Sequence, residues 1–429
     1  MRYWSLICFC IIAGVFGREE ARGELAGLFM TDEDKNSILA KVESGAEPWK
    51  AHYDDVLKRA KSALKREANP FWMEDVREIR FGRCGTNRGL NDTVSELCDQ
   101  LDKQSGTVRD LALAYSLSGN EQFAGQAESW ILAWVDGGTL LNFYDFNIDF
   151  SKSRFDGMTD SGFCGDRPWN MALDGMWQTY GLINVCDAFV MMKAGGYEFG
   201  EGNEERVEIW IRSLAEAVNS SFHAWTRWAD AHRGSRAYTR YRSDNHLSWC
   251  LAGLMAAAVA LDDDDLAAYV LSGGSWKDSK AGVYANPSSI REVIDLAVEA
   301  DEGGRNHGRI YEEKIRRDPP VGYSFFHLWP MSLVATMAEK RYGENLWSYQ
   351  GSDGVGLEDA YRRYAGYVLG EMESPRPEQE GSRTGYAWLF EIAASVWPDE
   401  DVFQQARDKG NRMKYMRQSI GPVSLIYRR

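Results

Sequence analysis

Apolar residues recur three and four positions apart along most of this chain, which is the spacing of one face of an α-helix. The segment 31–44, TDEDKNSILAKVES, predicts a helix with Thr31 or Asp32 as its N-cap, and the segment 49–65, WKAHYDDVLKRAKSALK, follows the same repeat. Residues 105–135 predict two helices that join at the sequence SGN, because Gly119 suits a left-handed helix end. Further helices are predicted at 172–193, 204–228, 247–261, 289–300, 323–341, 357–370 and 401–413.

The same pattern indicates a single all-α domain. Alternating apolar and polar residues, which predict strands, are scarce, and no long Pro- or Ser-rich linker divides the chain. Many helices joined by short turns are typical of stacked helical hairpins that curve into an α/α toroid with a concave groove. The chain has 16 Trp, 20 Tyr and 18 Phe; most of these rings are expected in the core, and some in the groove could stack on sugars.

Residues 1–17, MRYWSLICFCIIAGVFG, have the basic start, apolar middle and small residues of a secretory signal peptide. The alternative, a membrane anchor, is disfavoured because a spanning helix needs about 20 apolar residues. We therefore expect a secreted or periplasmic protein whose single domain covers residues 18–429. No other segment is apolar enough to cross a membrane.

Five cysteines follow this leader. In an oxidising compartment Cys84 could pair with Cys98, and Cys164 with Cys186. Buried free thiols are the alternative, and Cys250, within an apolar run, is expected in the core. No cysteine or histidine cluster has the spacing of a zinc site.

The formal charge of −15 argues against nucleic acid as a partner. The positive charges nevertheless gather in two places: Arg227, Arg233, Arg236, Arg240 and Arg242, and then Arg305, Arg309, Arg316 and Arg317. A local positive cleft on an acidic body focuses anionic substrates. The alternative is an ordinary solvated surface.

The stretch RSDNHLSW, residues 242–249, places polar groups at the start of an apolar helix. Asn245 and His246 lie in its first turn, where backbone N–H groups and the helix dipole favour an anion. Arg240 and Arg242 add positive charge, so the arrangement suits a carboxylate. The alternative is that Ser243 or Asp244 caps the helix and His246 is merely buried.

A second stretch, EEKIRRDPPVGYSFFHLWP, spans residues 312–330. Its two prolines end one element, and a new helix is expected near Val321, with Tyr323 in the first turn. A positive charge such as Arg316 lowers the pKa of a nearby phenol. A core tyrosine and a surface arginine are the alternative.

Together these motifs resemble the alginate lyase superfamily, polysaccharide lyase families 5 and 38. The shared features are an Asn-His pair that opens a helix, here Asn245-His246, and an Arg followed about seven residues later by a Tyr, here Arg316 and Tyr323. The likeness spans roughly residues 107–341. The chain departs from many relatives at Asp244, where they have a second Asn, and in the RDPPVG segment, which favours the more divergent family 38. An acid at 244 is expected either to cap the helix or to bind Arg242.

The resemblance implies an incomplete α/α toroid and β-elimination in a 1,4-linked uronan, without metal or cofactor. Asn245, Arg316 and His246 would neutralise the uronate carboxylate, and one such donor is worth about 10²–10³ in rate. Tyr323 would protonate the departing O4. It would also be the base for same-face elimination, as in mannuronan, whereas His246 is the better base for opposite faces, as in guluronan.

Further substrate contacts are expected around the motifs. The segment 159–181 offers rings, an amide and a positive charge; residues there and near the motifs are Arg167, Trp169, Asn170, Trp177, Gln178, Arg240, Tyr241, Arg242, Trp249 and His307. For each, a place in the core or in a loop is the alternative, and Trp249 could face either the site or the core.

Two other functions fit parts of the sequence. A toroidal glycoside hydrolase needs two carboxylates across the scissile bond, for which Asp160, Asp166 and Asp174 are candidates. A non-catalytic glycan-binding protein needs neither. An anionic polysaccharide is the expected partner; mannuronate-rich alginate is the first expectation, with guluronate-rich alginate and glucuronan left open, as are endo or exo action and oligomeric state.

Overall fold

The protein's structure, a computed structural model, describes residues 24–70, 88–137, 168–230, 242–276, 288–315, 319–410 and 415–428. Its longer helices are α1 (Asp32–Glu43), α2 (Trp49–Ala63), α4 (Arg88–Ser118), α5 (Glu121–Gly137), α7 (Pro168–Ala194), α8 (Asn203–Asp230), α10 (Asn245–Leu261), α11 (Asp264–Ser272), α12 (Ile290–Ala297), α14 (Pro320–Tyr342), α15 (Leu357–Leu369), α16 (Leu389–Val396) and α17 (Asp401–Asp408). The shorter elements are α13 (Tyr311–Ile315), α18 (Val423–Tyr427), the 3-10 helices η3 (Pro377–Gln379) and η4 (Arg383–Tyr386), and two antiparallel strand pairs, β1 (Val298–Glu299) with β2 (Arg309–Ile310) and β3 (Tyr415–Met416) with β4 (Gly421–Pro422).

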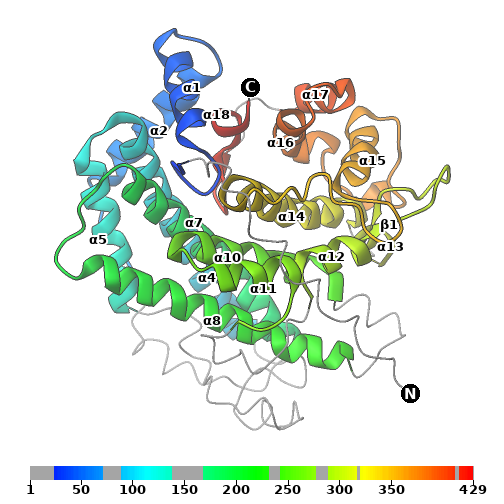
Figure 1. Ribbon diagram of the computed structural model, residues 1–429, viewed down its shortest axis with the longest axis horizontal. Coiled ribbons are helices and arrows are strands. Elements are labelled where there is room, and N and C mark those ends of the chain that lie inside the picture. Colours follow the sequence, from blue (N-terminus) through cyan, green and yellow to red (C-terminus); the bar gives the residue numbers. More distant parts are fainter. Residues whose placement is uncertain are drawn as a thin grey trace, which may run out of the picture.

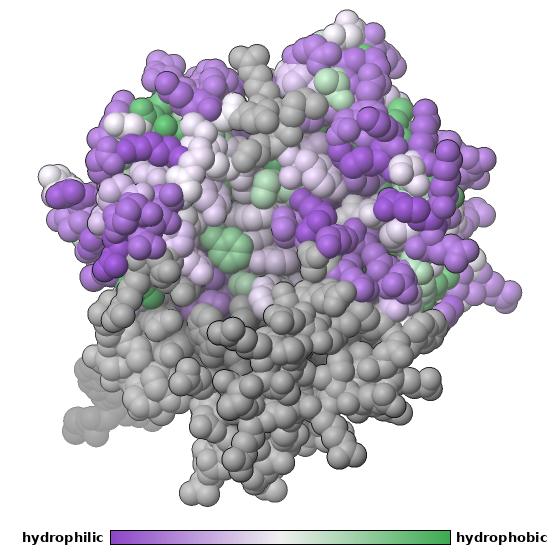
Figure 2. All heavy atoms as spheres, turned by 180° about the vertical axis from the view of Figure 1, so that it is seen from behind, coloured by the Kyte–Doolittle hydropathy of each residue, from purple (hydrophilic) through white to green (hydrophobic). Residues whose placement is uncertain are grey.

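The helices form two layers of an incomplete α/α toroid, as predicted. The inner layer runs from α4 to α7, α10 and α14, each helix packing against the next. Outside it, α5 packs on α4, α8 packs on α7 and α10, and α11 packs on α10. Figure 1 shows the chain passing from the blue N-terminal helices through the green ones to the yellow and red ones, and α18 returns to pack against α1 and α2. On the opposite face, Figure 2 shows hydrophilic side chains at both margins and paler residues between them.

The inner helices α10 and α14 run parallel. Near their N-terminal ends the rings of Trp249 and Phe326 lie 5.4 Å apart. At their C-terminal ends Asp262, the cap of α10, forms an ion pair with Arg341 in the last turn of α14. The first turns of both helices therefore lie at the same end of the toroid.

Close packing explains why α10 is apolar on all sides. Residues 245–260 of this helix are buried, since α7, α8 and α14 surround it. Gly253 lets α7 approach, because a β-carbon at this position would come within 2.2 Å of the Thr179 side chain. A helix that is buried all round carries no amphipathic stripe, so its sequence alone does not say which side faces a substrate.

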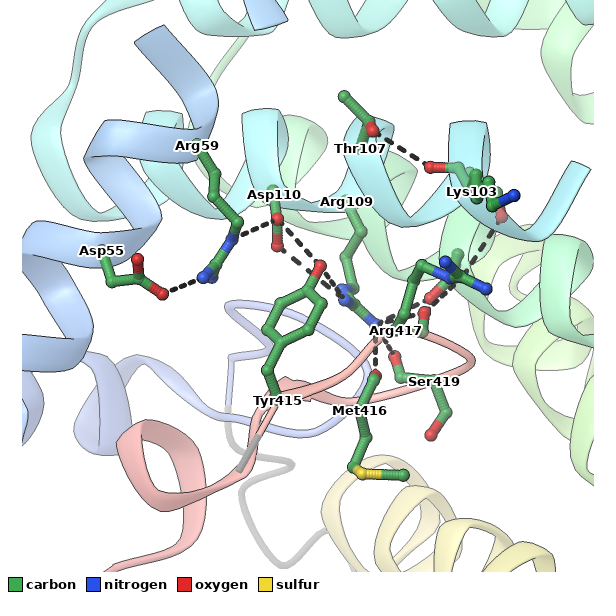
Figure 3. A network of polar contacts seen from close by, with 12 residues as sticks. Asp55, Arg59, Lys103, Thr107, Arg109, Asp110, Tyr415, Met416, Arg417 and Ser419 are labelled. Carbon is green, nitrogen blue, oxygen red and sulfur yellow. Dashed lines mark hydrogen bonds and ion pairs between the residues drawn. The ribbon is translucent and has the colours of Figure 1, made fainter. Parts of the chain in front are cut away.

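A buried guanidinium ties the C-terminal segment to the inner helices (Figure 3). Arg109 of α4 is fully buried; it donates to Asn184 Oδ1 of α7 at 2.7 Å and to the Ser419 carbonyl. Asn184 Nδ2 donates to the Arg417 carbonyl at 2.9 Å, and Trp329 Nε1 of α14 to Ser419 Oγ at 2.9 Å. Three inner helices thus hold the same few residues of the C-terminal segment.

Most predicted helices are present, and the deviations have local causes. Thr31 caps α1, and Gly119 adopts φ +69° after α4, both as expected. The helix predicted at 289–300 ends at Ala297 because Val298 and Glu299 pair with β2, and the one predicted at 401–413 ends at Asp408. Helices α11 and α16 and the first half of α4 were not predicted.

The structure tests the predictions for two of the cysteines. Cys250 is buried in the core, as expected. Cys186 is a buried free thiol on α7, so the predicted pair with Cys164 is not formed. Cys84, Cys164 and the leader of residues 1–17 lie outside the described residues, and the side chain of Cys98 is not described. Within the described ranges, no helix is both long and apolar enough to cross a bilayer.

The Arg109 contacts predict a large loss of stability when they are removed. Arg109→Met leaves Asn184 Oδ1 and the Ser419 carbonyl without their buried donor, so we expect the free energy of unfolding in urea to fall by about 3–5 kcal/mol. The control is Arg206→Met, which removes a largely exposed ion pair with Asp136 and should change it by less than about 1 kcal/mol. Equal effects of the two variants would contradict the role of Arg109.

Asp187 of α7 predicts a specific pH dependence. Its carboxylate is buried and accepts from the Leu28 N–H at 2.8 Å; burial raises its pKa to about 6, although Arg109 lowers it. Because the folded-state pKa lies above the unfolded one, this group adds stability below about pH 4 that is lost as pH rises through about 6. Between pH 4 and pH 7, the free energy of unfolding of the parent in urea should fall by about 3 kcal/mol relative to that of Asp187→Asn. A difference that stays flat or grows with pH would be incompatible with this assignment.

Candidate active site

Carboxylates already occupy the N-terminal end of α10. Asp244 is the N-cap, and its Oδ1 accepts from the backbone N–H groups of His246 at 3.1 Å and Leu247 at 3.3 Å. Glu312 Oε1 accepts from the Asn245 N–H at 3.1 Å. The expectation that this helix end offers free N–H groups to a substrate is therefore wrong. Any anion held here must be held by side chains.

Asp244 also orients His246. Its Oδ2 lies 3.2 Å from His246 Nδ1, and both side chains are buried. Because an ionised carboxylate can only accept, the hydrogen of a neutral imidazole is placed on Nδ1 and the lone pair on Nε2. The prediction that Asp244 caps the helix rather than remaining free is confirmed, and the pair adds a histidine whose Nε2 is prepared to take a proton.

Asn245 is held from a different element. Its Nδ2 donates to Glu312 Oε1 at 2.6 Å, while its Oδ1 is buried without a hydrogen-bond partner among the described residues. Glu312 is itself fully buried on the short helix α13. The next residue, Glu313, binds Arg363 at 2.7 Å and Tyr364 at 2.9 Å, both on α15. Helix α13 thus links the Asn-His motif to α15 just before Arg316.

Tyr323 lies in the first turn of α14, as predicted. The helix begins at Pro320, and its first free N–H groups, those of Val321 and Gly322, donate to the Glu380 carboxylate at 2.7 and 3.0 Å. The Tyr323 ring is partly exposed, and it is close enough to Tyr386 that the two phenols interact electrostatically. Burial raises the pKa of Tyr386, with Glu380 and Tyr323 adding to the effect.

The packing of α10 on α14 brings the two motifs to one place. Trp249 and Phe326 lie three residues after His246 and Tyr323, and their rings are in contact. Residues three apart share a helix face, so His246 and Tyr323 occupy the facing sides one turn nearer the helix starts. Trp249 itself is fully buried between Tyr180 and Trp329, at 4.7 and 4.9 Å. It is a core residue, which corrects its prediction as a substrate contact.

The remaining described candidates lie around this pair of helix starts. Arg242 is buried beside Glu292 of α12, with 3.7 Å between Nη2 and Oε1. On α7, Trp177 is partly exposed and Gln178 is fully buried; their substrate contacts stay predictions. His307 contacts Asp359 of α15 at 3.1 Å, so the structure assigns it to the α15 side rather than to the motifs.

Several predicted residues lie outside the described part of the chain. These are Arg167, Arg240, Tyr241 and Arg316, together with Asp160 and Asp166. Trp169, Asn170 and Asp174 belong to the first turns of α7, but their side chains are not described. The roles predicted for them stay predictions.

Sequence reasoning missed Glu312 and Glu380, which satisfy the backbone at the two helix starts. The only sequence signal was the pair of acids in EEKIR, directly before the basic residues. Among the described residues, no group of three His, Cys, Asp or Glu side chains is placed to hold a metal ion.

The fold and this site define a class: an α/α-toroid enzyme with an oriented histidine, an asparagine and a tyrosine at one end of its inner helices. The sequence model described as alginate lyase matches residues 61–374. The chain therefore belongs to the alginate lyase family and is a polysaccharide lyase.

Solved structures of low sequence identity share the fold. An alginate lyase from Bacteroides ovatus is 16% identical, with 93% of this chain and 98% of that chain covered and a TM-score of 0.53. Alginate lyase A1-III from Sphingomonas species A1 is 15% identical, with 95% and 97% covered and a TM-score of 0.58. No curated protein sequence matches the chain.

The Glu312–Asn245 contact predicts a positioning role. Glu312→Ala removes the acceptor for both N–H donors of Asn245, and a misplacement of the order of 1 Å can cost about 10²-fold in turnover. We expect a loss of that size in the rate at which unsaturated uronate product forms, measured by the rise in ultraviolet absorbance. Glu312→Gln keeps an acceptor oxygen and should recover part of it.

The matched control is Glu299→Ala, since the side-chain partners of Glu299 among the described residues are the partly exposed Arg309 and the exposed Lys314. Its turnover should equal that of the parent. If Glu312→Ala and Glu299→Ala have the same turnover, Glu312 does not position Asn245.

Proposed function

We propose that the protein cleaves alginate by β-elimination at the start of α10 and α14. In this reaction a base removes the C5 proton of a uronate, the C4–O4 bond breaks, and an acid gives a proton to O4. The double bond forms between C4 and C5, and no water is consumed. The family supports alginate as the substrate class, and the leader-like residues 1–17 support export to where such a polymer is found.

The observation that carries the assignment of roles is the Asp244–His246 contact at 3.2 Å. It leaves Nε2 of His246 as an acceptor, which is what a general base needs. Tyr323, on the facing turn of α14, is the acid that protonates O4. Guluronate carries its C5 proton and its O4 on opposite faces, so a base and an acid from two helices suit it. Mannuronate carries them on the same face, where Tyr323 would perform both steps.

The uronate carboxylate must be neutralised for its C5 proton to become acidic. Asn245, whose amide is fixed by Glu312, lies beside His246 and is one candidate; Arg316, directly after α13, is the other. A solved relative supports the roles given to His246 and Tyr323. Alginate lyase A1-III has been crystallised with a tetrasaccharide as a histidine-to-alanine variant and as a tyrosine-to-phenylalanine variant.

The two roles predict different losses on two polymers. Tyr323→Phe should lower turnover at least about 10³-fold on both polymannuronate and polyguluronate, because O4 then has no proton donor. His246→Ala should lower turnover on polyguluronate about 10²–10⁴-fold and on polymannuronate much less. Ultraviolet absorbance of the unsaturated product measures both rates.

Tyr349→Phe serves as the matched control, because it removes a phenolic hydroxyl that bonds to Asp295 at 2.9 Å, beyond the C-terminal end of α14. Near-parent activity is expected from it on both polymers. An active Tyr323→Phe variant would remove Tyr323 as the acid. If His246→Ala lowers turnover equally on the two polymers, His246 is not a base specific to opposite-face elimination.

A further inference from the structure

A cavity lies away from the starts of α10 and α14. Its volume is about 320 Å³, and it is bounded by α2, α4, α5 and the strand β3. Figure 3 shows the part of its wall where Arg59, Asp110, Tyr415 and Arg417 meet. Helix α7 stands between α4 and α10, so this cavity is separate from the site of His246 and Tyr323.

The wall of the cavity carries an excess of positive charge. Four cationic side chains, Arg59, Arg66, Lys103 and Arg417, line it with a single carboxylate, Asp110. Arg59 is paired with Asp55 and Asp110, and Arg417 with Asp102. Arg66 has no carboxylate partner among the described residues; its guanidinium lies 5.8 Å from the Trp130 ring centre. A basic hollow of this kind on a chain of net charge −15 concentrates an anion.

The hydrogen-bonding groups in this wall suit a ligand that both accepts and donates hydrogen bonds. Trp130 is 3% exposed, and its Nε1–H has no hydrogen-bond partner among the described residues. Arg59 Nη2 is also buried without a hydrogen-bond partner among these residues. On the acceptor side, Asp110 Oδ1 lies 3.8 Å from Arg109 Nη2 in an ion pair, and it has no hydrogen-bond partner among the described residues. Buried polar atoms are nearly always satisfied, so unsatisfied ones around a cavity point to a missing partner. A carboxylate satisfies the donors, and a hydroxyl group satisfies Asp110.

We propose that this cavity is an accessory binding site for a uronate residue of an acidic polysaccharide. A sugar acid carries both a carboxylate and hydroxyl groups, whereas sulfate carries no donor for Asp110. The cavity volume is at the lower end for small-molecule sites, which suits one or two sugar residues. The identity of the polymer rests on the proposed function. The site holds part of a chain whose cleavage takes place at α10 and α14, so it contributes to polymer affinity and not to chemistry.

Arg66→Ala tests this site in the full chain. The expected result is a KM for polymeric alginate raised about tenfold with unchanged kcat, because one charge-assisted contact is lost. Trp130→Phe keeps the ring, removes the N–H and should raise KM several-fold by the same reasoning. Lys65→Ala is the matched control: it removes the same charge one residue away, outside the cavity, and should leave KM unchanged.

A calorimetric titration with a uronate tetrasaccharide, on the Tyr323→Phe background, gives the second readout. Arg66→Ala should weaken or abolish one of two binding events. Parent-like KM and binding in Arg66→Ala, or binding of sodium sulfate at matched ionic strength as tight as that of the tetrasaccharide, would overturn the accessory site. Failure of the proposed function looks different: the parent protein would then form no unsaturated product from any uronan.

Discussion

The buried guanidinium of Arg109 is the contact on which the arrangement of the inner helices depends. It lies in the middle of α4, bonds to α7 through Asn184, and holds the carbonyl groups of the C-terminal segment, which in turn receives Trp329 of α14. A guanidinium can serve this purpose because it presents five donors in a rigid plane. Gly421 completes the arrangement. It adopts φ +77°, and a β-carbon there would come within 2.9 Å of Arg109. An incomplete toroid has no last hairpin to close its ring, and this contact ties three of its inner helices together instead.

The parallel inner helices bring their starts to one end, and that end is built from carboxylates as much as from cations. Asp244 and Glu312 satisfy the start of α10, and Glu380 satisfies the start of α14. An anionic substrate is therefore not drawn in by bare helix dipoles. Its carboxylate must be met by side chains that these acids orient: His246 by Asp244, and Asn245 by Glu312. Preorganisation of this kind keeps donors and acceptors in place before the substrate arrives, which is the main source of electrostatic catalysis.

The sequence predicted what depends on local chemistry. The periodicity of α2 and α8 was readable because it repeats within each helix, and the cap at Asp244 was readable because its partners are two and three residues away. Long-range contacts were not. Arg109 bonds to residues 75 and 310 positions away, and Glu312 to one 67 positions away. Trp249 could not be assigned from sequence, since helical spacing gives its face but not what lies opposite. Of the two alternatives left open for Cys186, the buried free thiol is the one present.

The central proposal is that the starts of α10 and α14 together form the site that holds a uronate. The most direct measurement is a crystal structure of the Tyr323→Phe protein with an alginate tetrasaccharide. The account predicts one uronate at these helix starts, with its carboxylate beside Asn245 and its C5 hydrogen facing His246 Nε2 for a guluronate residue. A tetrasaccharide bound elsewhere, with both helix starts unoccupied, would contradict it.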